Sequence, residues 1–207
     1  MARKTKEDAL KTRETIIDAA VRIFAVRGVS RTTLVEIAQE AGVTRGAIYW
    51  HFKNKEDLLE VLWDDVFSPF EAVNSAAEKG EERDTLGLLK KTYLDLFRGL
   101  SQHPRRLQML KIFLNNSESE DDQSYQMQLS HFREGQCIIT KVYNQAIARG
   151  QLPVSFDVHL ATLTTMVFIN GLLRKWIMFP DELGVDHEIP ALLEILDQMI
   201  RTGFVKS

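Results

Sequence analysis

The stretch AGVTRGAIYWHFKNKEDLL, residues 41–59, places small residues, one Arg, two aromatic residues and a His within ten positions, and then turns to charge. It follows TTLVEIAQE, in which Thr33 and Glu36 have the spacing of a capping box in front of an apolar run. Gly42 ends that short helix, and Thr44 can cap a second helix of barely two turns, RGAIYWH. Two short helices joined by AGV have the spacing of a helix-turn-helix.

The second helix of such a motif enters the major groove, so the residues at its start decide what it can read. Small side chains at Gly46 and Ala47 let this end approach base edges closely. Arg45 can reach guanine O6 and N7, and the Ala47 methyl can touch a thymine methyl. Thr44, together with the backbone N–H groups around it, suits a phosphate. The stretch therefore predicts a surface that reads duplex DNA.

Flanking residues supply further contacts to the DNA backbone. Tyr49 and His51 offer an O–H and an imidazole N–H to phosphates, Lys55 can pair with them electrostatically, and Thr33 faces the opposite phosphate strand. Singly, each has an ordinary alternative, such as a core aromatic, a cap or a solvated charge. Their combination at this spacing favours DNA contact by the set Thr33, Thr44, Arg45, Gly46, Ala47, Tyr49, Trp50, His51 and Lys55.

The rest of the chain indicates helices with short breaks, and hence an all-α fold. Pro and Gly are scarce, and strand-like alternation is hard to find. A first helix ends at Gly28, and a fourth is capped from Asn54 to Asp57, with Pro69 as either a bend or an end. We expect about nine helices, the later ones at about 84–101, 104–115, 121–149, 157–179 and 188–203.

Charge is distributed unevenly along the 207 residues, whose formal net charge is −3. Residues 1–55 hold 11 Lys and Arg against 6 Asp and Glu, whereas residues 56–207 hold 15 against 23. The basic end is the only plausible face for a polyanion. Taken alone, this modest excess favours a solvated basic tail over nucleic-acid binding.

Several classes of protein are disfavoured. The single Cys137 excludes an internal disulfide and fits a reducing cytosol, and MARKTKED lacks the apolar run of a secretory signal. The most apolar window, residues 160–179, carries Arg174 and Lys175, so we expect a buried helix and no membrane span. The five His residues are scattered, and no phosphate loop, nucleophile elbow or zinc-protease motif occurs. We therefore expect no catalytic residue, metal or cofactor, and a cytoplasmic protein.

A family resemblance rests on the same residues. The whole of 12–59 closely resembles the DNA-binding domain of TetR-family transcription repressors, and VTRGAIYWHF, residues 43–52, is a specific form of its motif. ARGQLP at 148–153 and NGLLRKWIMFP at 170–180 are similar to the AcrR-like branch, which represses multidrug efflux pump genes. The resemblance implies a DNA-binding domain in 1–55, linked by a fourth helix from 54 to a helical ligand-binding and dimerisation domain in 56–207. It also implies release of DNA when ligand binds.

Apolar walls with a few polar groups are typical of small-molecule sites. For any one Phe, core packing is the alternative to ligand contact. Asn170 and Arg174 lie one turn apart in an apolar segment and would cost energy if buried unpaired, so either a ligand or a pairing between helices is expected there. The resemblance favours the ligand. The predicted lining is Trp63, Val66, Phe67, Phe70, Phe97, Gln108, Ile112, Phe113, Phe132, Gln136, Ile139, Ile169, Asn170 and Arg174.

The last two helices, which include 159–173 and 191–200, are apolar around more than one face, so part of that surface is expected to pack on a partner subunit. A four-helix dimer interface is implied by the resemblance. The resulting hypothesis is a dimeric repressor that binds a near-palindromic operator, controls an efflux operon and is released by amphiphilic or aromatic compounds. The alternatives are an enzyme, a constitutive architectural DNA-binding protein, and a family repressor of a metabolic gene with one dedicated ligand.

Overall fold

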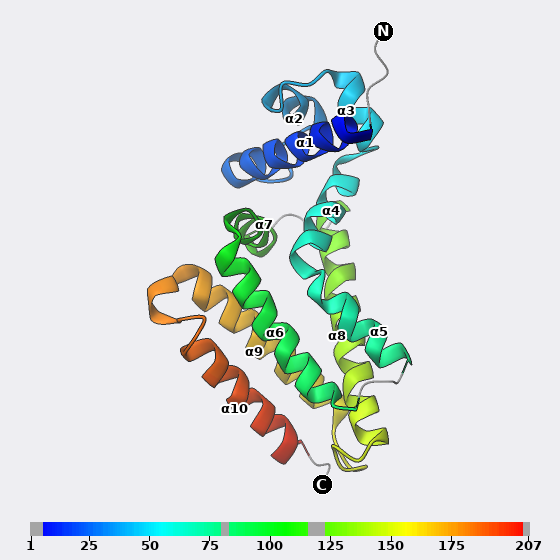
Figure 1. The fold of residues 1–207 in the computed structure, drawn as a ribbon, viewed down its shortest axis with the longest axis vertical. Coiled ribbons are helices and arrows are strands. Elements are labelled where there is room, and N and C mark those ends of the chain that lie inside the picture. The colour runs from blue at the N-terminus through cyan, green and yellow to red at the C-terminus, as the bar shows by residue number, and fades with distance from the viewer. Residues whose placement is uncertain (1–5, 80–82, 116–122, 205–207) are drawn as a thin grey trace. The chain divides into compact units, whose positions relative to one another are not determined.

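The computed structural model describes residues 6–79, 83–115 and 123–204, and these residues form α-helices and one 3-10 turn, with no strand among them (Figure 1). The predicted all-helical class is confirmed. The predicted break at NNSESEDD falls mostly in residues 116–122, outside the described ranges. The helices are α1 (Lys6–Arg27), α2 (Leu34–Glu40), α3 (Arg45–His51), α4 (Lys55–Phe67), α5 (Pro69–Lys79), α6 (Thr85–Gln102), α7 (Pro104–Asn115), α8 (Gln123–Ala148), α9 (Val158–Met178), η1 (Pro180–Glu182) and α10 (Glu188–Thr202).

Internal contacts group these helices into two compact units. Unit 1 lies within residues 1–66 and 103–129, and unit 2 within residues 67–102 and 130–207. Unit 1 therefore contains α1, α2, α3, most of α4, and α7, whereas unit 2 contains α5, α6, α9, α10 and most of α8.

The helix-turn-helix forms through contacts between residues close in sequence. The predicted capping box is present: the Thr33 hydroxyl accepts from the Glu36 N–H at 3.3 Å, and Glu36 accepts from the Thr33 N–H at 2.8 Å. The Thr33 N–H, and next the Thr33 hydroxyl that donates to the same carboxylate, hold the pKa of Glu36 below its ordinary value. The Thr44 hydroxyl accepts from the Ala47 N–H at 3.1 Å and starts α3. Between the two helices, Gly42 has φ +65°, a conformation that side chains rarely adopt.

The apolar core of the helix-turn-helix region is formed by buried residues of α1, α2 and α3. Ile16, Ala20 and Phe24 are buried on one face of α1, as the periodicity predicted, and Ile37 from α2 and Ile48 from α3 are also buried. Ile48 is the single buried residue of α3, so one apolar anchor holds that helix while the rest of its side chains stay at least partly accessible.

The region around Asn54 and Pro69 shows how α4 starts and ends. The Asn54 side chain accepts from the Asp57 N–H at 2.8 Å, and the Asp57 carboxylate accepts from the Lys53 N–H at 3.0 Å. The helix ends at Phe67, and Pro69 opens α5, where its missing N–H costs no helical hydrogen bond. An end at this point, in place of a bend, makes ten α-helices in the described residues where about nine were expected.

Ion pairs fasten α7 within unit 1. The Arg105 guanidinium lies 2.9 Å from both Glu14 and Asp18 of α1, and Arg106 lies 3.0 Å from Asp65 of α4. Two basic residues in the first turn of a helix oppose its macrodipole, so these carboxylates also offset an unfavourable local charge.

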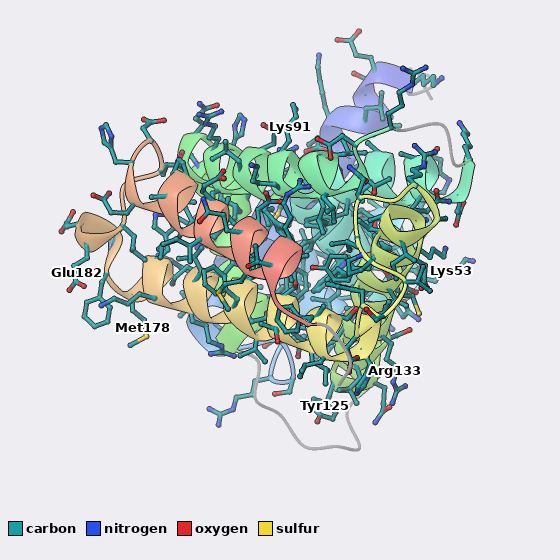
Figure 2. The ribbon with its side chains drawn as sticks, turned by 90° about the horizontal axis from the view of Figure 1, so that it is seen from below. Lys53, Lys91, Tyr125, Arg133, Met178 and Glu182 are labelled. Atoms are coloured by element: carbon teal, nitrogen blue, oxygen red, sulfur yellow. The ribbon has the colours of Figure 1, made fainter. Side chains whose placement is uncertain are left out.

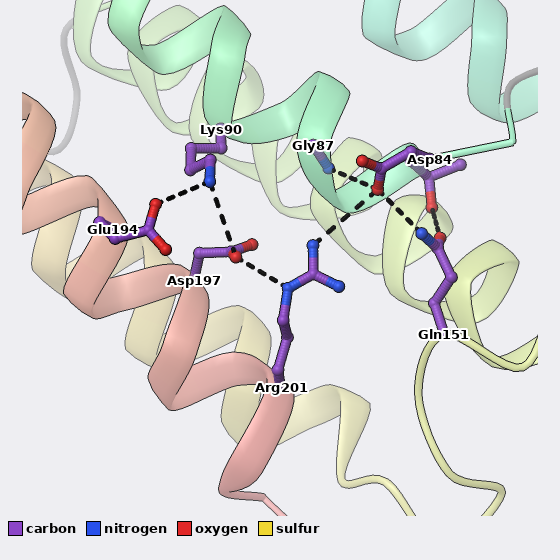
Figure 3. Close-up of polar contacts among 8 residues, drawn as sticks. Asp84, Gly87, Lys90, Gln151, Glu194, Asp197 and Arg201 are labelled. Carbon is purple, nitrogen blue, oxygen red and sulfur yellow. Dashed lines mark hydrogen bonds and ion pairs between the residues drawn. The ribbon is translucent and has the colours of Figure 1, made fainter.

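In unit 2, α10 runs alongside α6 and α9 (Figure 1). A polar network joins α10 to α6 (Figure 3). Lys90 lies 2.9 Å from Glu194 and 3.8 Å from Asp197, while Arg201 lies 2.7 Å from Asp197 and 3.9 Å from Asp84. The hydrogen bond and charge of Lys90 hold the pKa of Glu194 below its ordinary value. About two helical turns of α10 are thereby held to the start of α6.

The same network continues to the turn after α8. The Gln151 side chain donates to Asp84 at 2.8 Å and accepts from Thr85 at 3.1 Å. Asp84 also accepts from the Gly87 N–H at 2.9 Å (Figure 3). That backbone bond, assisted by Gln151 and Arg201, lowers the pKa of Asp84.

No helix within the described ranges is both long and apolar enough to cross a bilayer. The apolar window at 160–179 forms most of α9, with Ile169, Leu172, Leu173 and Trp176 buried. Its exposed positions, among them Leu163, Val167, Arg174 and Met178, lie on a second face.

Candidate functional site

The outer surface of α3 carries most of the predicted DNA-binding side chains. Thr44, Arg45 and Gly46 are exposed at its start, and Tyr49 and Trp50 keep 45% and 73% of their surface exposed. Two large aromatic side chains that the fold leaves uncovered are not core residues, so the structure rules out that alternative for both. The arrangement leaves this face of α3 open to a partner.

Arg45 differs from its neighbouring arginines in what it contacts. Arg22 and Arg27 each lie 3.1 Å from a carboxylate, on Glu40 and Glu36. The Arg45 guanidinium instead lies over the Tyr49 ring, 5.7 Å from its centroid, and forms no ion pair with any residue that the structure describes. Its N–H groups are therefore available to an acceptor outside the protein.

Gly46 leaves room that the chain itself does not use. A Cβ at this position would meet only the Thr44 hydroxyl, at 4.0 Å, and the backbone φ is not positive. Neither packing nor conformation thus requires glycine here. An absent side chain at the exposed start of α3 permits the close approach to base edges that the sequence predicted.

Three other residues predicted to contact DNA already have partners within the protein. The Thr33 hydroxyl donates to Glu36 at 2.9 Å, so a phosphate would have to compete with that carboxylate. Lys55 donates to the Val29 carbonyl at 2.9 Å, which uses one of its three N–H bonds and ties α4 to the turn after α1. His51 packs edge-on against Trp50, with centroids 4.6 Å apart.

The predicted ligand-lining residues divide between the two units. In unit 1, Trp63 packs edge-on against Phe113 with centroids 5.1 Å apart. Val66 and Ile112 are buried, and Gln108 is half-buried. In this conformation these side chains contribute to the core of unit 1.

In unit 2, aromatic pairs dominate the predicted lining. Phe97 is fully buried and packs edge-on against Trp176, with ring centroids 5.6 Å apart. The centroid of the Phe70 ring lies 6.4 Å from that of Phe67 and 5.3 Å from that of Tyr93. Of the remaining positions, the structure buries Ile139 and Ile169 and half-buries Phe132 and Gln136.

Asn170 and Arg174 do not lie together in a buried polar pair. The Asn170 side chain is half-buried and donates to the Met166 carbonyl of its own helix at 2.8 Å. Arg174 is exposed, so the alternative of a buried pairing between helices does not apply to its side chain in this conformation. The reason is helical geometry: Arg174 shares a face of α9 with Val167 and Met178, which are also exposed.

That face forms an uncovered apolar stripe on the last two long helices. On α9, Leu160 is 51% exposed, Val167 73% and Met178 69%, and Met178 projects outward near Glu182 of η1 (Figure 2). Leu163 on α9 and Ile195 and Met199 on α10 are exposed as well. Apolar side chains gathered in this way indicate an interaction surface.

A small hollow lies among α6, α8, α9 and α10. It holds about 20 Å³ and is lined in part by Tyr93, Tyr143, Thr165 and Asp197. The Tyr143 and Thr165 hydroxyls lie 2.5 Å apart, and burial raises the pKa of Tyr143 to about 12. Such a volume suits one water molecule and is far below that of a drug-sized ligand. These polar groups could not be assigned to one site from the sequence, because they lie on four different helices.

A larger cleft of about 410 Å³ lies in unit 1 between α1, α4 and α7. Its lining is charged and includes Arg13, Glu14, Asp65, Arg105 and Arg106. The sequence analysis did not single out these residues, although two arginines directly after Pro104 are an unfavourable helix start that signals nearby carboxylates. This charged lining does not have the apolar character expected for the ligand site.

Comparison with known proteins agrees with these features. Residues 16–62 match the family profile described as bacterial regulatory proteins, tetR family, and residues 84–202 match the MAATS-type transcriptional repressor, C-terminal region. The chain is 37% identical to the HTH-type transcriptional regulator TtgR of Pseudomonas putida over 206 residues, which cover 97% of each chain. It is 32% identical to the regulator AcrR of Shigella flexneri, over 96% of this chain and 94% of that protein.

Solved structures show the same fold. NalD, the secondary repressor of the MexAB-OprM multidrug efflux pump in Pseudomonas aeruginosa, superposes with a TM-score of 0.77 at 28% identity, over 98% of this chain and 100% of NalD. SmeT in complex with triclosan superposes with a TM-score of 0.81 at 28% identity, over 95% of this chain and 93% of SmeT.

An exposed two-turn helix capped by Thr44, packed on α2 and followed by a helical second half, defines a helix-turn-helix transcription regulator. With both of its parts matched, the chain belongs to the tetR family of bacterial regulatory proteins, and its C-terminal part is of the MAATS repressor type.

Proposed function

We propose that the protein represses a multidrug efflux operon by binding a near-palindromic operator as a dimer, and that an amphiphilic or aromatic compound releases it. Residues 1–55 bind DNA, α4 links the two domains, and residues 56–207 bind ligand and dimerise. The observation that carries the proposal is α3, whose exposed face presents Arg45 free of any carboxylate among the described residues, beside the exposed rings of Tyr49 and Trp50.

The efflux target comes from relatives. NalD is a repressor of a multidrug efflux pump, and a relative from Escherichia coli, 30% identical over 94% of this chain, is a probable acrEF/envCD operon repressor. SmeT, which represses the Stenotrophomonas maltophilia multidrug efflux pump SmeDEF, forms a complex with triclosan. We propose the same role and the same broad ligand class for this chain, acting in the cytoplasm without catalysis or cofactor.

For DNA contact we propose the set predicted from the sequence, with Arg45 reading a base pair and the others setting position. Thr44 and Tyr49 reach phosphates, and Lys55 adds charge with the N–H bonds that Val29 does not use. For the ligand we propose the predicted apolar lining. Phe67 and Asn170 are the most useful test positions because both are half-buried, so their replacement disturbs the core less than that of Phe97.

Dimerisation is proposed through the apolar stripe on α9 and α10. Leu160, Leu163, Val167, Ile195 and Met199 all remain exposed in the single chain. Covering them would bury apolar surface worth about 25 cal/mol per Å², and twofold symmetry would place two copies of α3 on successive major grooves.

The test starts with full-length protein and a library of random duplexes, from which bound sequences are selected. A near-palindromic consensus and a sedimenting mass of two chains are expected. The selected operator complex is then titrated with dyes, antibiotics and phenolic compounds. Several unrelated compounds should weaken DNA binding, by a factor of about 5 to 150, and the Phe67→Ala and Asn170→Ala variants should respond less.

Each outcome bears on the proposal. Failure to enrich any sequence would remove the repressor assignment. Release by a single compound alone would favour the alternative of a metabolic-gene repressor with one dedicated ligand. If the Phe67 and Asn170 variants respond like the parent protein, the ligand site lies elsewhere.

A further inference from the structure

We propose that the Tyr49 ring positions Arg45 for base reading, and that Tyr49 is thereby a determinant of sequence specificity in addition to any phosphate contact by its hydroxyl. This inference rests on the proposed function. It assigns to the ring and to the hydroxyl of one side chain two separate tasks, which two substitutions can separate.

The geometry follows from the spacing of the two residues. Arg45 is the first residue of α3 and Tyr49 lies four positions later, so the two side chains share one face of the helix. The guanidinium carbon lies 5.7 Å from the ring centroid, within the range of a cation–π contact. Tyr49 is 45% exposed, so the pair lies at the surface that faces a partner.

The contact with the ring leaves the reading groups of Arg45 without a carboxylate partner. A guanidinium carries five N–H bonds in a planar fork. An aromatic ring offers no oxygen acceptor to that fork, so its N–H bonds stay available for guanine O6 and N7, whereas an ion pair with a carboxylate would occupy them. Within unit 1, Arg105 and Arg106 show the second situation, because carboxylates of α1 and α4 hold them at 2.9 and 3.0 Å.

The ring also lowers the cost of ordering Arg45. A long, exposed Arg samples many rotamers, and fixing it on a base pair costs conformational entropy unless it is already held. Among the described residues, the Tyr49 ring is the contact that the structure gives the Arg45 guanidinium. Losing this contact reduces the advantage of the preferred base pair over the others and leaves general attraction to phosphates in place.

The experiment compares two substitutions in the full-length protein. Tyr49→Phe keeps the ring and removes the hydroxyl, whereas Tyr49→Leu keeps apolar bulk and removes the ring. Selection with the parent protein and with Arg45→Ala first identifies the base pair that Arg45 reads. Dissociation constants are then measured on that operator and on one with this base pair changed, and the ratio of the two constants is the specificity ratio.

We expect Tyr49→Leu to lower the specificity ratio by about two- to fivefold per half-site, the range of an exposed cation–π contact. Tyr49→Phe should weaken both duplexes together and keep the ratio of the parent. Val26→Ala is the control: it shortens an exposed side chain of α1 that lies outside the proposed DNA-contact set, and its specificity ratio at this base pair should not change. Thermal unfolding of each variant checks that α3 remains folded.

The results separate this inference from the proposed function. If the parent protein selects no sequence, the proposed function fails. If the parent selects an operator and Arg45→Ala relaxes one base pair, but Tyr49→Leu keeps the parental ratio, the positioning role is refuted. Equal loss of the ratio in Tyr49→Phe and Tyr49→Leu would assign the effect to the hydroxyl and would also overturn it.

Discussion

The helix-turn-helix and the junction of α6 with α10 are held together by different kinds of contact. In the former, each cap joins residues three positions apart, at Thr33, Thr44 and Asn54. In the latter, the contact between Lys90 and Glu194 spans 104 positions. Local contacts form at little cost in loop closure, whereas distant ones require the intervening chain to be ordered. The DNA-reading end is thus specified locally, and the regulatory end depends on helices far apart in sequence.

Among the substitutions that test this difference, Phe97→Ala has the largest expected effect on stability. The side chain is fully buried and packs on Trp176 of α9, so its removal leaves a cavity between helices distant in sequence. We expect a loss of about 3–5 kcal/mol in the free energy of unfolding, measured by urea denaturation. A loss below about 1 kcal/mol would mean that this core relaxes around the gap and that the distant packing matters less than we infer.

Asp197→Ala tests the ionic part of the α6–α10 junction. Its side chain is 10% exposed and faces both Lys90 and Arg201, so its removal leaves Lys90 with Glu194 alone and Arg201 with only the longer contact to Asp84. We expect a loss of about 2 kcal/mol, between the values for buried and surface pairs. The matched control is Glu40→Ala, which removes an exposed pair with Arg22 in the helix-turn-helix and should cost less than about 1 kcal/mol. Equal costs would contradict the contrast between the two regions.

Gly42→Ala probes the turn of the helix-turn-helix. The space around this position is open, but φ is +65°, where an L side chain is strained. A loss of about 1–2 kcal/mol in unfolding free energy is expected from the backbone alone. Calorimetry of the variant checks it, and an unchanged midpoint would show that the turn adopts another conformation without cost.

Gly46→Ala sharpens the comparison within the same motif. This glycine is helical and unhindered, so Ala should stabilise the fold by about 0.5–1 kcal/mol. The added methyl at the exposed start of α3 should at the same time weaken operator binding, because the backbone can no longer approach the bases as closely. Melting and DNA titration are measured on one preparation. Unchanged DNA affinity would show that no close approach occurs at Gly46.

The smallest effect expected is the pH dependence contributed by Asp84. Its folded pKa is lowered, first by the Gly87 N–H and then by Gln151 and Arg201, so its ionised form favours the folded state. That stabilisation is complete above the pKa of the unfolded chain and is lost as pH falls through the folded pKa. The difference in stability between the parent and Asp84→Asn should therefore be constant near neutrality and shrink in acid. A difference that grows on acidification would contradict the assignment.

What could be predicted from the sequence follows the same division. The caps at Thr33, Thr44 and Asn54 and the stop at Gly28 were readable because donor, acceptor and spacing all lie within one helical turn. The exposure of Arg174 could not be read from the sequence, because an apolar window does not reveal which face of a helix is covered. The contacts of Lys55 with Val29 and of Lys90 with Glu194 join positions far apart in the sequence, so no local sequence pattern predicts them.

The interleaving of the two units bears on how the protein is made. Unit 1 needs α7, which follows α5 and α6 in the chain, so the surface of α1 around Glu14 and Asp18 has no Arg105 to meet when the helix-turn-helix leaves the ribosome. Translation at about 5–20 residues per second leaves that surface uncovered for several seconds. During this interval α9 and α10, which carry the proposed dimer surface, have not yet been synthesised. Dimerisation through that surface therefore begins only after most of the polypeptide has been synthesised.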